Sequence, residues 1–499
     1  MYKNEVFEAE DLLTKNRNVV EGRPKKRLCC KIPVRFWIGC MVFLTTYINY
    51  TTRVNMSISI VSMTMGKTKG VPECKREDIK PVTEGGSTTT AKPLPDYGPR
   101  YGWDENVQGT ILGSYFWGYV ITSLPGGFIA EWLGPFKTVF WAHVVTAVMN
   151  AACVFAPGLH WGVLVFCRFV IGLCAGPIYP ALQCLIARWA PPAEKGKFVG
   201  ALMGNTLGTC VTWPFVGAIT QAFGWDWGFY TMTIQMAVFL IIFWIITADS
   251  PADHRWISEE EKNYIAESQG GSVTKTKAIP PYVSIFTSIP FWALQVLHFG
   301  NLWGLYLQIT GAPKFMSEVV GFDLKSAGGL AALPHLLRMF LGMGFGSIGD
   351  FLKKREVSTK FIRKFFVLFS HILPGVLMIG ISFVGCKWIP IVALLILSQA
   401  INGAAVLTNL SNPQDLAPNF AGTIFGIISF IGGMTGFIVP QITGVLTNEN
   451  NGVKEWGWAF IIGGCAYIFC GLFFIIFGKV EKQPWNEKKA DTEKPETST

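Results

Sequence analysis

Charged residues are scarce in this chain of 499 residues. Only 15% of the residues are Asp, Glu, Lys or Arg, against about 25% in an average soluble protein. Half of the residues are hydrophobic, and the chain contains 18 Trp and 38 Phe. This balance excludes an ordinary water-soluble globular protein and indicates a chain whose main solvent is lipid.

The motifs of common catalytic centres are also missing. The sequence has no His-Glu-x-x-His, no Cys-x-x-Cys and no phosphate-binding glycine loop, so we do not expect an enzyme, a resident cofactor or a metal centre held by such a motif. Of the 12 cysteines, most lie in apolar runs and only Cys74 lies clearly in a polar loop. The cysteines therefore predict no disulfide framework.

Apolar stretches long enough to cross a bilayer recur along the chain, because about 20 helical residues span a hydrocarbon core of ~30 Å. They predict an all-α membrane protein with twelve transmembrane helices in two six-helix halves. The expected divisions are a tail (1–35), a first half (36–248) with a loop at 66–104, a linker (249–287), a second half (288–478) and a tail (479–499). The predicted spans are 36–64, 106–130, 138–157, 160–187, 198–223, 227–248, 288–312, 327–349, 361–385, 388–410, 420–446 and 456–478.

Basic residues cluster in loops that this topology places on one side. Examples are Arg23 to Arg35 before the first span, Arg188 to Lys197 after the fourth, and Lys353 to Lys364 after the eighth. Short basic loops stay in the cytosol, so we expect both termini to be cytosolic. The net charge of +9 then reflects topology and contact with anionic lipid, and nucleic acid is not an expected partner.

A short motif occurs once in each half, after a long apolar run. It reads Gly127-Phe-Ile-Ala-Glu131 followed by Lys137, and Gly346-Ser-Ile-Gly-Asp350 followed by Arg355. The pair resembles the cytosolic hinge of the major facilitator superfamily. That resemblance implies a substrate site between two parallel repeats, and a conformational gate formed by the six named residues.

Longer segments resemble solute carrier family 17, the anion:cation symporters. They include Arg53-Val-Asn-Met-Ser, Gly113-Ser-Tyr-Phe-Trp-Gly-Tyr and Trp189-Ala-Pro-Pro-Ala. Asn301-Leu-Trp-Gly-Leu-Tyr and Ala312-Pro-Lys-Phe-Met are similar to the insect-type inorganic phosphate cotransporters of that family. The resemblance implies secondary active transport of a small anion, with sodium-coupled phosphate symport as the first expectation.

Three arginines lie deep inside predicted spans: Arg53, Arg168 and Arg338. A charge at mid-bilayer costs roughly 2.5–3.5 kcal/mol on insertion scales, so it faces water or a partner. Arg53 lies about 27 Å along a helix from Arg35, and Arg168 about 30 Å from Arg188, so the two share a depth. Without an acid at that depth, they predict an anionic substrate bound by guanidinium groups. Alternatively, these side chains bond backbone carbonyls or extend toward the membrane surface.

The sequence departs from the family's proton-coupled members. Ala175 stands where glutamate-type and sialin-type members have an acid, Leu112 replaces a histidine of the vesicular glutamate pattern, and Asn301 replaces an arginine. Sodium is therefore the expected coupling ion, since oxygen ligands suffice for it. His298 and His335 are alternative proton carriers, although each is also typical of a hydrogen-bonded core histidine.

Two expectations concern the surroundings of the transporter. Glu8, Leu12 and Leu13 have the spacing of an acidic dileucine sorting signal, a short pattern that also arises by chance. As a signal, it predicts sorting adaptors as partners and a lysosomal or vesicular membrane; the plasma membrane is the other expected location. We expect a monomer.

A proton-coupled or facilitative carrier of organic anions (sialate, glutamate-like or urate-like) is the alternative function, and an anion channel or nutrient receptor on the same fold is the alternative from another class.

Overall fold

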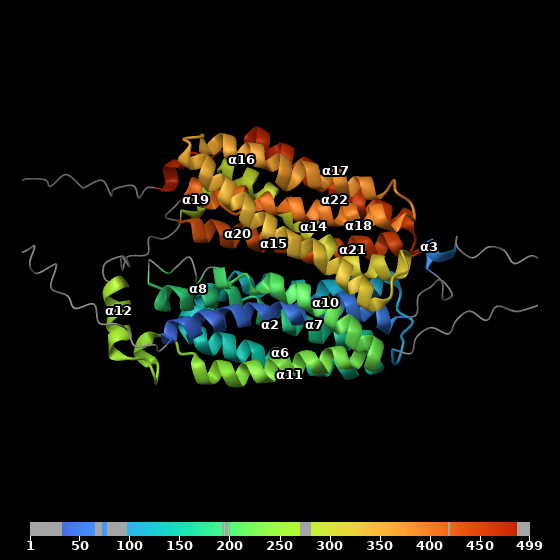
Figure 1. The fold of residues 1–499 in the computed structure, drawn as a ribbon, viewed down its shortest axis with the longest axis horizontal. Coiled ribbons are helices and arrows are strands. Elements are labelled where there is room, and N and C mark those ends of the chain that lie inside the picture. The colour runs from blue at the N-terminus through green and yellow to red at the C-terminus, as the bar shows by residue number, and fades with distance from the viewer. Residues whose placement is uncertain are drawn as a thin grey trace, which may run out of the picture.

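The structure is a computed structural model in which two helical bundles lie side by side (Figure 1). It describes residues 32–64, 72–76, 97–191, 194, 198, 200–269, 281–417 and 420–486, and the side chains of 76, 131, 269, 350, 414, 421 and 422 are not described within these ranges. The sorting signal Glu8, Leu12 and Leu13 lies outside the described residues, so it stays a prediction.

The first bundle is formed by helices that run alternately in opposite directions. They are α2 (Val34–Met63), α4 (Glu105–Ser123) with α5 (Gly126–Leu133), α6 (Pro135–Leu159), α7 (Trp161–Ala175) with α8 (Ile178–Trp189), α10 (Gly204–Phe223) and α11 (Trp225–Ile246).

The second bundle repeats this arrangement. It contains α14 (Ile289–Lys314) with η2 (Phe315–Val319), α15 (Leu324–Lys354), α16 (Thr359–Val367) with η3 (Leu368–Ile372) and α17 (Leu373–Ile381), α18 (Trp388–Ile401) with η4 (Asn402–Leu407), α20 (Ala421–Gly433) with α21 (Thr435–Thr447), and α22 (Val453–Phe477). Short elements lie outside the bundles: α3 (Glu73–Arg76), η1 (Pro251–Asp253), α12 (Glu259–Gln269), α13 (Tyr282–Phe286), α19 (Asn412–Leu416) and η6 (Pro484–Asn486).

Each of the twelve predicted spans overlaps a described helix or two helices in line, so the predicted fold class is confirmed. Among the described residues, seven helical segments are long and apolar enough to cross a membrane by length and composition. Three of the remaining spans carry the polar residues of interest: Arg53 in α2, His298 and Asn301 in α14, and Arg338 in α15. Their lower hydropathy is the expected cost of a polar site inside a membrane protein.

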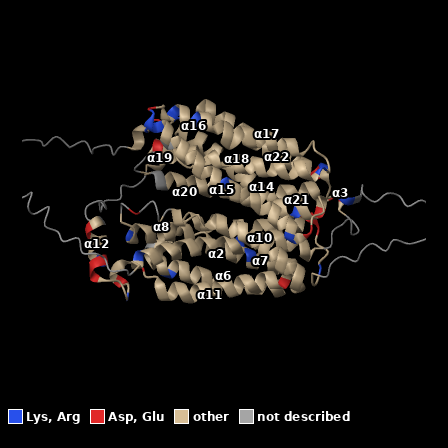
Figure 2. Cartoon of the chain, viewed as in Figure 1, with Lys and Arg blue, Asp and Glu red and all other residues tan. Residues whose placement is uncertain are grey.

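The two ends of the molecule differ from the middle in charge. Figure 2 shows Lys, Arg, Asp and Glu gathered at both ends of the bundles, with few charges between. We name the ends by the short helix at each: α12 lies at one end and α3 at the other (Figure 1). At the α12 end, Arg35 pairs with Glu194 (3.0 Å) and with Glu261 of α12 (3.1 Å), which fixes α12 against the start of α2.

The bundles pack against each other toward the α3 end. There α10 lies along α15 and α4 lies along α21, and small residues permit the close approach. A Cβ added at Gly328 would lie 2.5 Å from the Trp213 carbonyl oxygen, and one at Gly109 would lie 2.6 Å from that of Pro440. Side-chain hydrogen bonds that join the halves in the described part of the chain, such as Gln221 to Asp323 (2.8 Å), lie in the central or α3-end part of the molecule. The structure is therefore a state closed at the α3 end.

The gate motifs lie at the α12 end, in α5 and at the end of α15. The positive φ of 89° at Gly134 begins the turn between α5 and α6, where Asp249 accepts a hydrogen bond from the Phe136 amide (2.9 Å). Lys137 is exposed, and the exposed Arg355 lies over the ring of Phe351. Gly127 and Gly346 are partly exposed. The side chains of Glu131 and Asp350 lie outside the described set, so their gating role stays a prediction.

The structure contains a disulfide that the sequence did not predict. Cys74, in α3, forms a disulfide with Cys386, and the two Cα atoms lie 5.0 Å apart. Cys386 occupies the short turn between α17 and α18, one residue beyond a predicted span, where the sequence alone gave no sign that it faces Cys74. The bond attaches the segment that follows α2 in the first half to the second half. Glu73 adds to this attachment by accepting a hydrogen bond from the Val453 amide (2.7 Å).

This pairing leads to a labelling prediction. We expect a thiol reagent to modify Cys74 in the Cys386→Ser variant without prior reduction, whereas in the unmodified chain Cys74 reacts only after reduction. The loss of one disulfide is expected to cost roughly 2–5 kcal/mol of stability. Mass spectrometry of the peptide containing Cys74 measures the modification, and the Cys465→Ser variant, which removes an exposed free cysteine, is the matched control. Modification of Cys74 in the unreduced parent chain would contradict the pairing.

Candidate anion site

Arg53 is buried at the centre of a cluster of aromatic rings. Only 6% of the residue is exposed, and its guanidinium carbon lies 4.8–5.4 Å from the centres of five rings. Such cation–π contacts stabilise a desolvated guanidinium without neutralising it. The rings belong to Tyr50, Tyr115, Phe116, Tyr119 and Tyr306.

Arg53 also joins the two halves. Its Nη2 donates a hydrogen bond of 2.6 Å to the hydroxyl of Tyr306 on α14, while its Nε has no hydrogen-bond partner. A buried N–H group without a partner is costly. An anion oxygen at this position would satisfy the unpaired donor and would contact both halves through Arg53 and Tyr306.

Arg168 of α7 lies next to the backbone of Arg53, at the depth predicted from the sequence. Its two terminal nitrogens donate to the backbone carbonyls of Thr52 (3.1 Å) and Arg53 (3.2 Å), and its guanidinium carbon lies 5.2 Å from the centre of the Tyr115 ring. In this state Arg168 therefore holds the turn of α2 that carries Arg53, which is the alternative left open by the sequence. Its Nε is unpaired, so it still contributes a positive charge to the site.

Arg338 belongs to a polar network inside the second half. Its Nε donates to Asn402 Oδ1 (2.9 Å), and Asn402 Nδ2 donates to Asn301 Oδ1 (3.0 Å) and to the Ser370 carbonyl (2.6 Å). Asn402 therefore joins Arg338 and Asn301 within the second half.

The two histidines have different surroundings. His298 is 3% exposed and its Nδ1 lies 2.8 Å from Asn409 Nδ2, so the imidazole accepts a hydrogen bond there. His335 packs its ring against Trp213 of the first half, with centroids 5.3 Å apart, and its Nε2 has no partner. His298 thus has the contacts of a core histidine, whereas His335 is buried at the interface between the two halves.

The structure brings together Arg53 with Arg168, and Arg338 with Asn301, while sequence reasoning missed the aromatic and polar residues around them. These are Tyr50, Tyr115, Tyr306, Asn402, Asn409, Ser370 and Thr408. Asn402 and Asn409 follow the apolar run of α18, and a search for polar residues at the ends of such runs would have found them. The tyrosines give no comparable signal, because aromatic residues are common throughout this chain.

The site has an excess of positive charge. Among the ion pairs between described residues, none includes Arg53, Arg168 or Arg338. Three buried or half-buried guanidinium groups without carboxylate partners form an environment that favours an anion.

Comparison with known proteins agrees with this architecture. Residues 40–440 match the Major Facilitator Superfamily. Two solved structures share the fold: a D-xylose-proton symporter (TM-score 0.60, 14% identity, 88% of this chain and 98% of that chain) and a bacterial homolog of the lysosomal transporter Spinster in an inward-facing and occupied conformation (TM-score 0.61, 13% identity, 89% and 97%). The chain belongs to the major facilitator superfamily and is a multi-pass membrane transporter.

Similarity in sequence to individual transporters shows which family within the superfamily the chain belongs to. The chain is 32% identical to human sialin over 478 residues, covering 94% of each protein, and 31% identical to vesicular glutamate transporter 1 of Bos taurus, covering 93% of this chain and 80% of that one. Within the superfamily, the chain belongs to solute carrier family 17. The narrower resemblance to insect-type phosphate cotransporters stays a prediction.

Proposed function

We propose that the chain moves a small anion across a membrane by alternating access, with inorganic phosphate as the anion and sodium as the coupling ion. The observation that carries the proposal is the unpaired positive charge of Arg53 and Arg168, buried where α2 of the first half faces α14 of the second. Phosphate oxygens accept hydrogen bonds from guanidinium groups in a bidentate geometry.

The contacts suggest how binding is linked to movement. Arg53 donates to the Tyr306 hydroxyl, and an arriving anion would compete for this donor. Arg168 would keep Arg53 in position through the α2 carbonyls. An anion held from both halves favours their approach around it, as in transporters with a site between two repeats.

A carrier of organic anions is the second candidate. The relatives include vesicular glutamate transporters, whose names state an organic anion as substrate, and such a carrier could use a proton gradient or none. Ala175, where the proton-coupled pattern has an acid, and Asn301, where the vesicular glutamate pattern has an arginine, favour phosphate and sodium instead. An anion channel or a nutrient receptor on the same fold would show no saturable, gradient-driven accumulation.

Uptake by proteoliposomes distinguishes these candidates. We expect saturable uptake of labelled phosphate that follows a sodium gradient, exceeds uptake of glutamate and sialate, and falls at least about tenfold when choline replaces sodium at fixed pH. Undiminished phosphate uptake in choline would reject sodium coupling. Preference for glutamate or sialate would reject phosphate as the substrate.

A further inference from the structure

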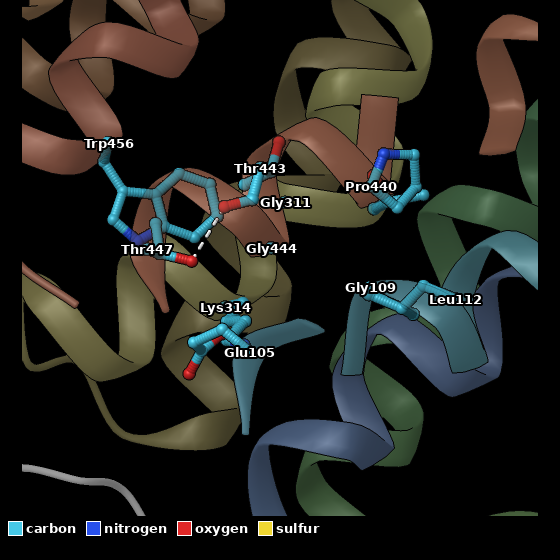
Figure 3. A pocket seen from close by; sticks show the side chains of 11 residues that line it. Glu105, Gly109, Leu112, Gly311, Lys314, Pro440, Thr443, Gly444, Thr447 and Trp456 are labelled. Atoms are coloured by element: carbon cyan, nitrogen blue, oxygen red, sulfur yellow. Dashed lines mark hydrogen bonds and ion pairs between the residues drawn. The ribbon is translucent and has the colours of Figure 1, made fainter. Parts of the chain in front are cut away.

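A second charged cluster lies at the α3 end, away from the arginines of the anion site. Lys314, on the last turn of α14, forms hydrogen bonds to the carboxylate of Glu105 and the amide oxygen of Gln108 on α4. The side chains of Lys314 and Glu105 are 5% and 7% exposed. Because α4 belongs to the first half and α14 to the second, this is an ion pair between the halves. Figure 3 shows Lys314 and Glu105 side by side at the edge of a small cavity.

A second carboxylate completes the cluster. Glu318 of η2 lies 3.9 Å from the Lys314 ammonium and its side chain is 14% exposed. The amide of Asn451 donates to Glu318 Oε2 (2.5 Å) and, more weakly, to Glu105 Oε1 (3.5 Å). Trp456 Nε1 fixes that amide by donating to Asn451 Oδ1 (2.7 Å). The set of Lys314, Glu105, Glu318 and Asn451 is called the latch below.

The charges of the latch do not balance. Two carboxylates face one ammonium, so the closed arrangement buries a net charge of −1 when both acids are ionised. Glu105 forms the direct ion pair with Lys314, whereas Glu318 lies farther from the ammonium, at 3.9 Å. Burial away from water disfavours the uncompensated charge, and uptake of one proton by Glu318 removes it.

Among the ion pairs between described residues, Lys314 is the cation that reaches Glu105 and Glu318. The exposed Lys75 of α3 packs against Gly321, three residues beyond Glu318, and the exposed Lys454 lies at the first turn of α22, but neither forms such a pair. Glu73 of α3 and Glu455 of α22 flank Gly452, next to Asn451, and both lie at the first turn of α22, where the helix dipole favours negative charge. Thr443 and Thr447 of α21 and Thr310 of α14 line the cavity without charge. Asp323, which joins α15 to Gln221, is not the proton acceptor: burial alone would raise its pKa, but hydrogen bonds from Ser326 and Gln221 hold the pKa of Asp323 below its ordinary value.

We propose that Lys314, Glu105 and Glu318 form a pH-sensitive latch that closes the transporter at the α3 end and binds one proton as it closes. The latch rests on the proposed alternating access, and it does not depend on the identity of the anion. Since the closed state holds more protons than the open state, a fall in pH favours closure of the α3 end. For one proton, the ratio of closed to open molecules changes by up to about tenfold per pH unit.

The distance between the halves at the α3 end tests the latch. Leu159, at the end of α6, and Val445, on α21, are 77% and 60% exposed, so each can be replaced by a fluorescent amino acid in the otherwise intact transporter. Energy transfer between the two dyes in proteoliposomes without anion is expected to report closure as the pH falls from 8 to 5.

Substitutions identify the group that titrates. Glu318→Gln is expected to keep the α3 end closed at every pH, and Lys314→Met is expected to open it at pH 8 because two buried acids then lack a cation. Glu449→Gln, which changes an exposed acid at the same end, should respond to pH as the parent does. A pH response in Glu318→Gln equal to that of the parent would overturn the latch, even if Lys314→Met failed to fold.

The dye measurement also separates the latch from the proposed function. A dye distance that ignores pH while phosphate uptake proceeds would overturn the latch alone. A dye distance that follows pH in a protein that accumulates no anion would overturn the proposed function alone.

Discussion

Arg53→Lys is expected to reduce anion uptake by about 10- to 100-fold while the amount of folded protein in the membrane stays normal. Lysine keeps the positive charge but presents a single ammonium, so it cannot bind two anion oxygens in one plane. It also loses the contacts of the planar guanidinium with the rings of Tyr115 and Phe116. Hydrogen bonds to charged groups contribute roughly 1.5–3 kcal/mol each, and 1.4 kcal/mol corresponds to tenfold.

Initial rates of labelled anion uptake measure this effect, with Arg255→Lys as the matched control. Arg255 is exposed between η1 and α12, so the same chemical change there should leave uptake within about twofold of the parent. Normal uptake by Arg53→Lys would remove Arg53 from the binding site and with it the main support for the proposed function.

Asn402→Leu is expected to be the most destabilising single change in the second half. The side chain is fully buried and connects Arg338, Asn301 and Ser370. Leucine fills similar space but leaves the Arg338 Nε and two buried oxygens without this partner, at a cost of roughly 2–4 kcal/mol. The melting temperature of the detergent-solubilised protein should fall by roughly 2–4 °C.

A double-mutant cycle with Arg338→Met tests the cause of that loss. If the cost arises from the stranded guanidinium, the double variant should recover about 0.5–3 kcal/mol relative to the sum of the single changes. Asn450→Leu, at an exposed asparagine, is the control for the substitution itself and should change the melting temperature little. Strict additivity would show that Arg338 does not depend on Asn402.

The arginines illustrate how far depth can be predicted along a helix. A rise of 1.5 Å per residue placed Arg53 and Arg168 at one level, and the hydrogen bond from Arg168 to the Arg53 carbonyl confirms it. The partner of each guanidinium could not be predicted in the same way, because it depends on how α2, α4, α7 and α14 rotate about their axes. That rotation gives Arg53 the phenol of Tyr306 and gives Arg168 two backbone carbonyls.

The latch and the disulfide show the same limit more strongly. Lys314 lies just beyond a predicted span and Glu105 just before another, so each has the sequence pattern of an ordinary charge at a membrane surface. Their burial arises only because the two halves close over them. Cys74 and Cys386 are likewise brought together from opposite halves of the chain.

The sequence by itself determined the transmembrane class, the twelve spans and the repeated halves, because the cost of placing polar groups in lipid acts locally and leaves a regular pattern of apolar runs. It also determined that arginines without nearby acids lie inside the spans. Only the tertiary structure decided which polar groups meet across the halves and which end is closed. Those contacts join residues hundreds of positions apart, and they depend on helix rotation and packing that no local pattern encodes.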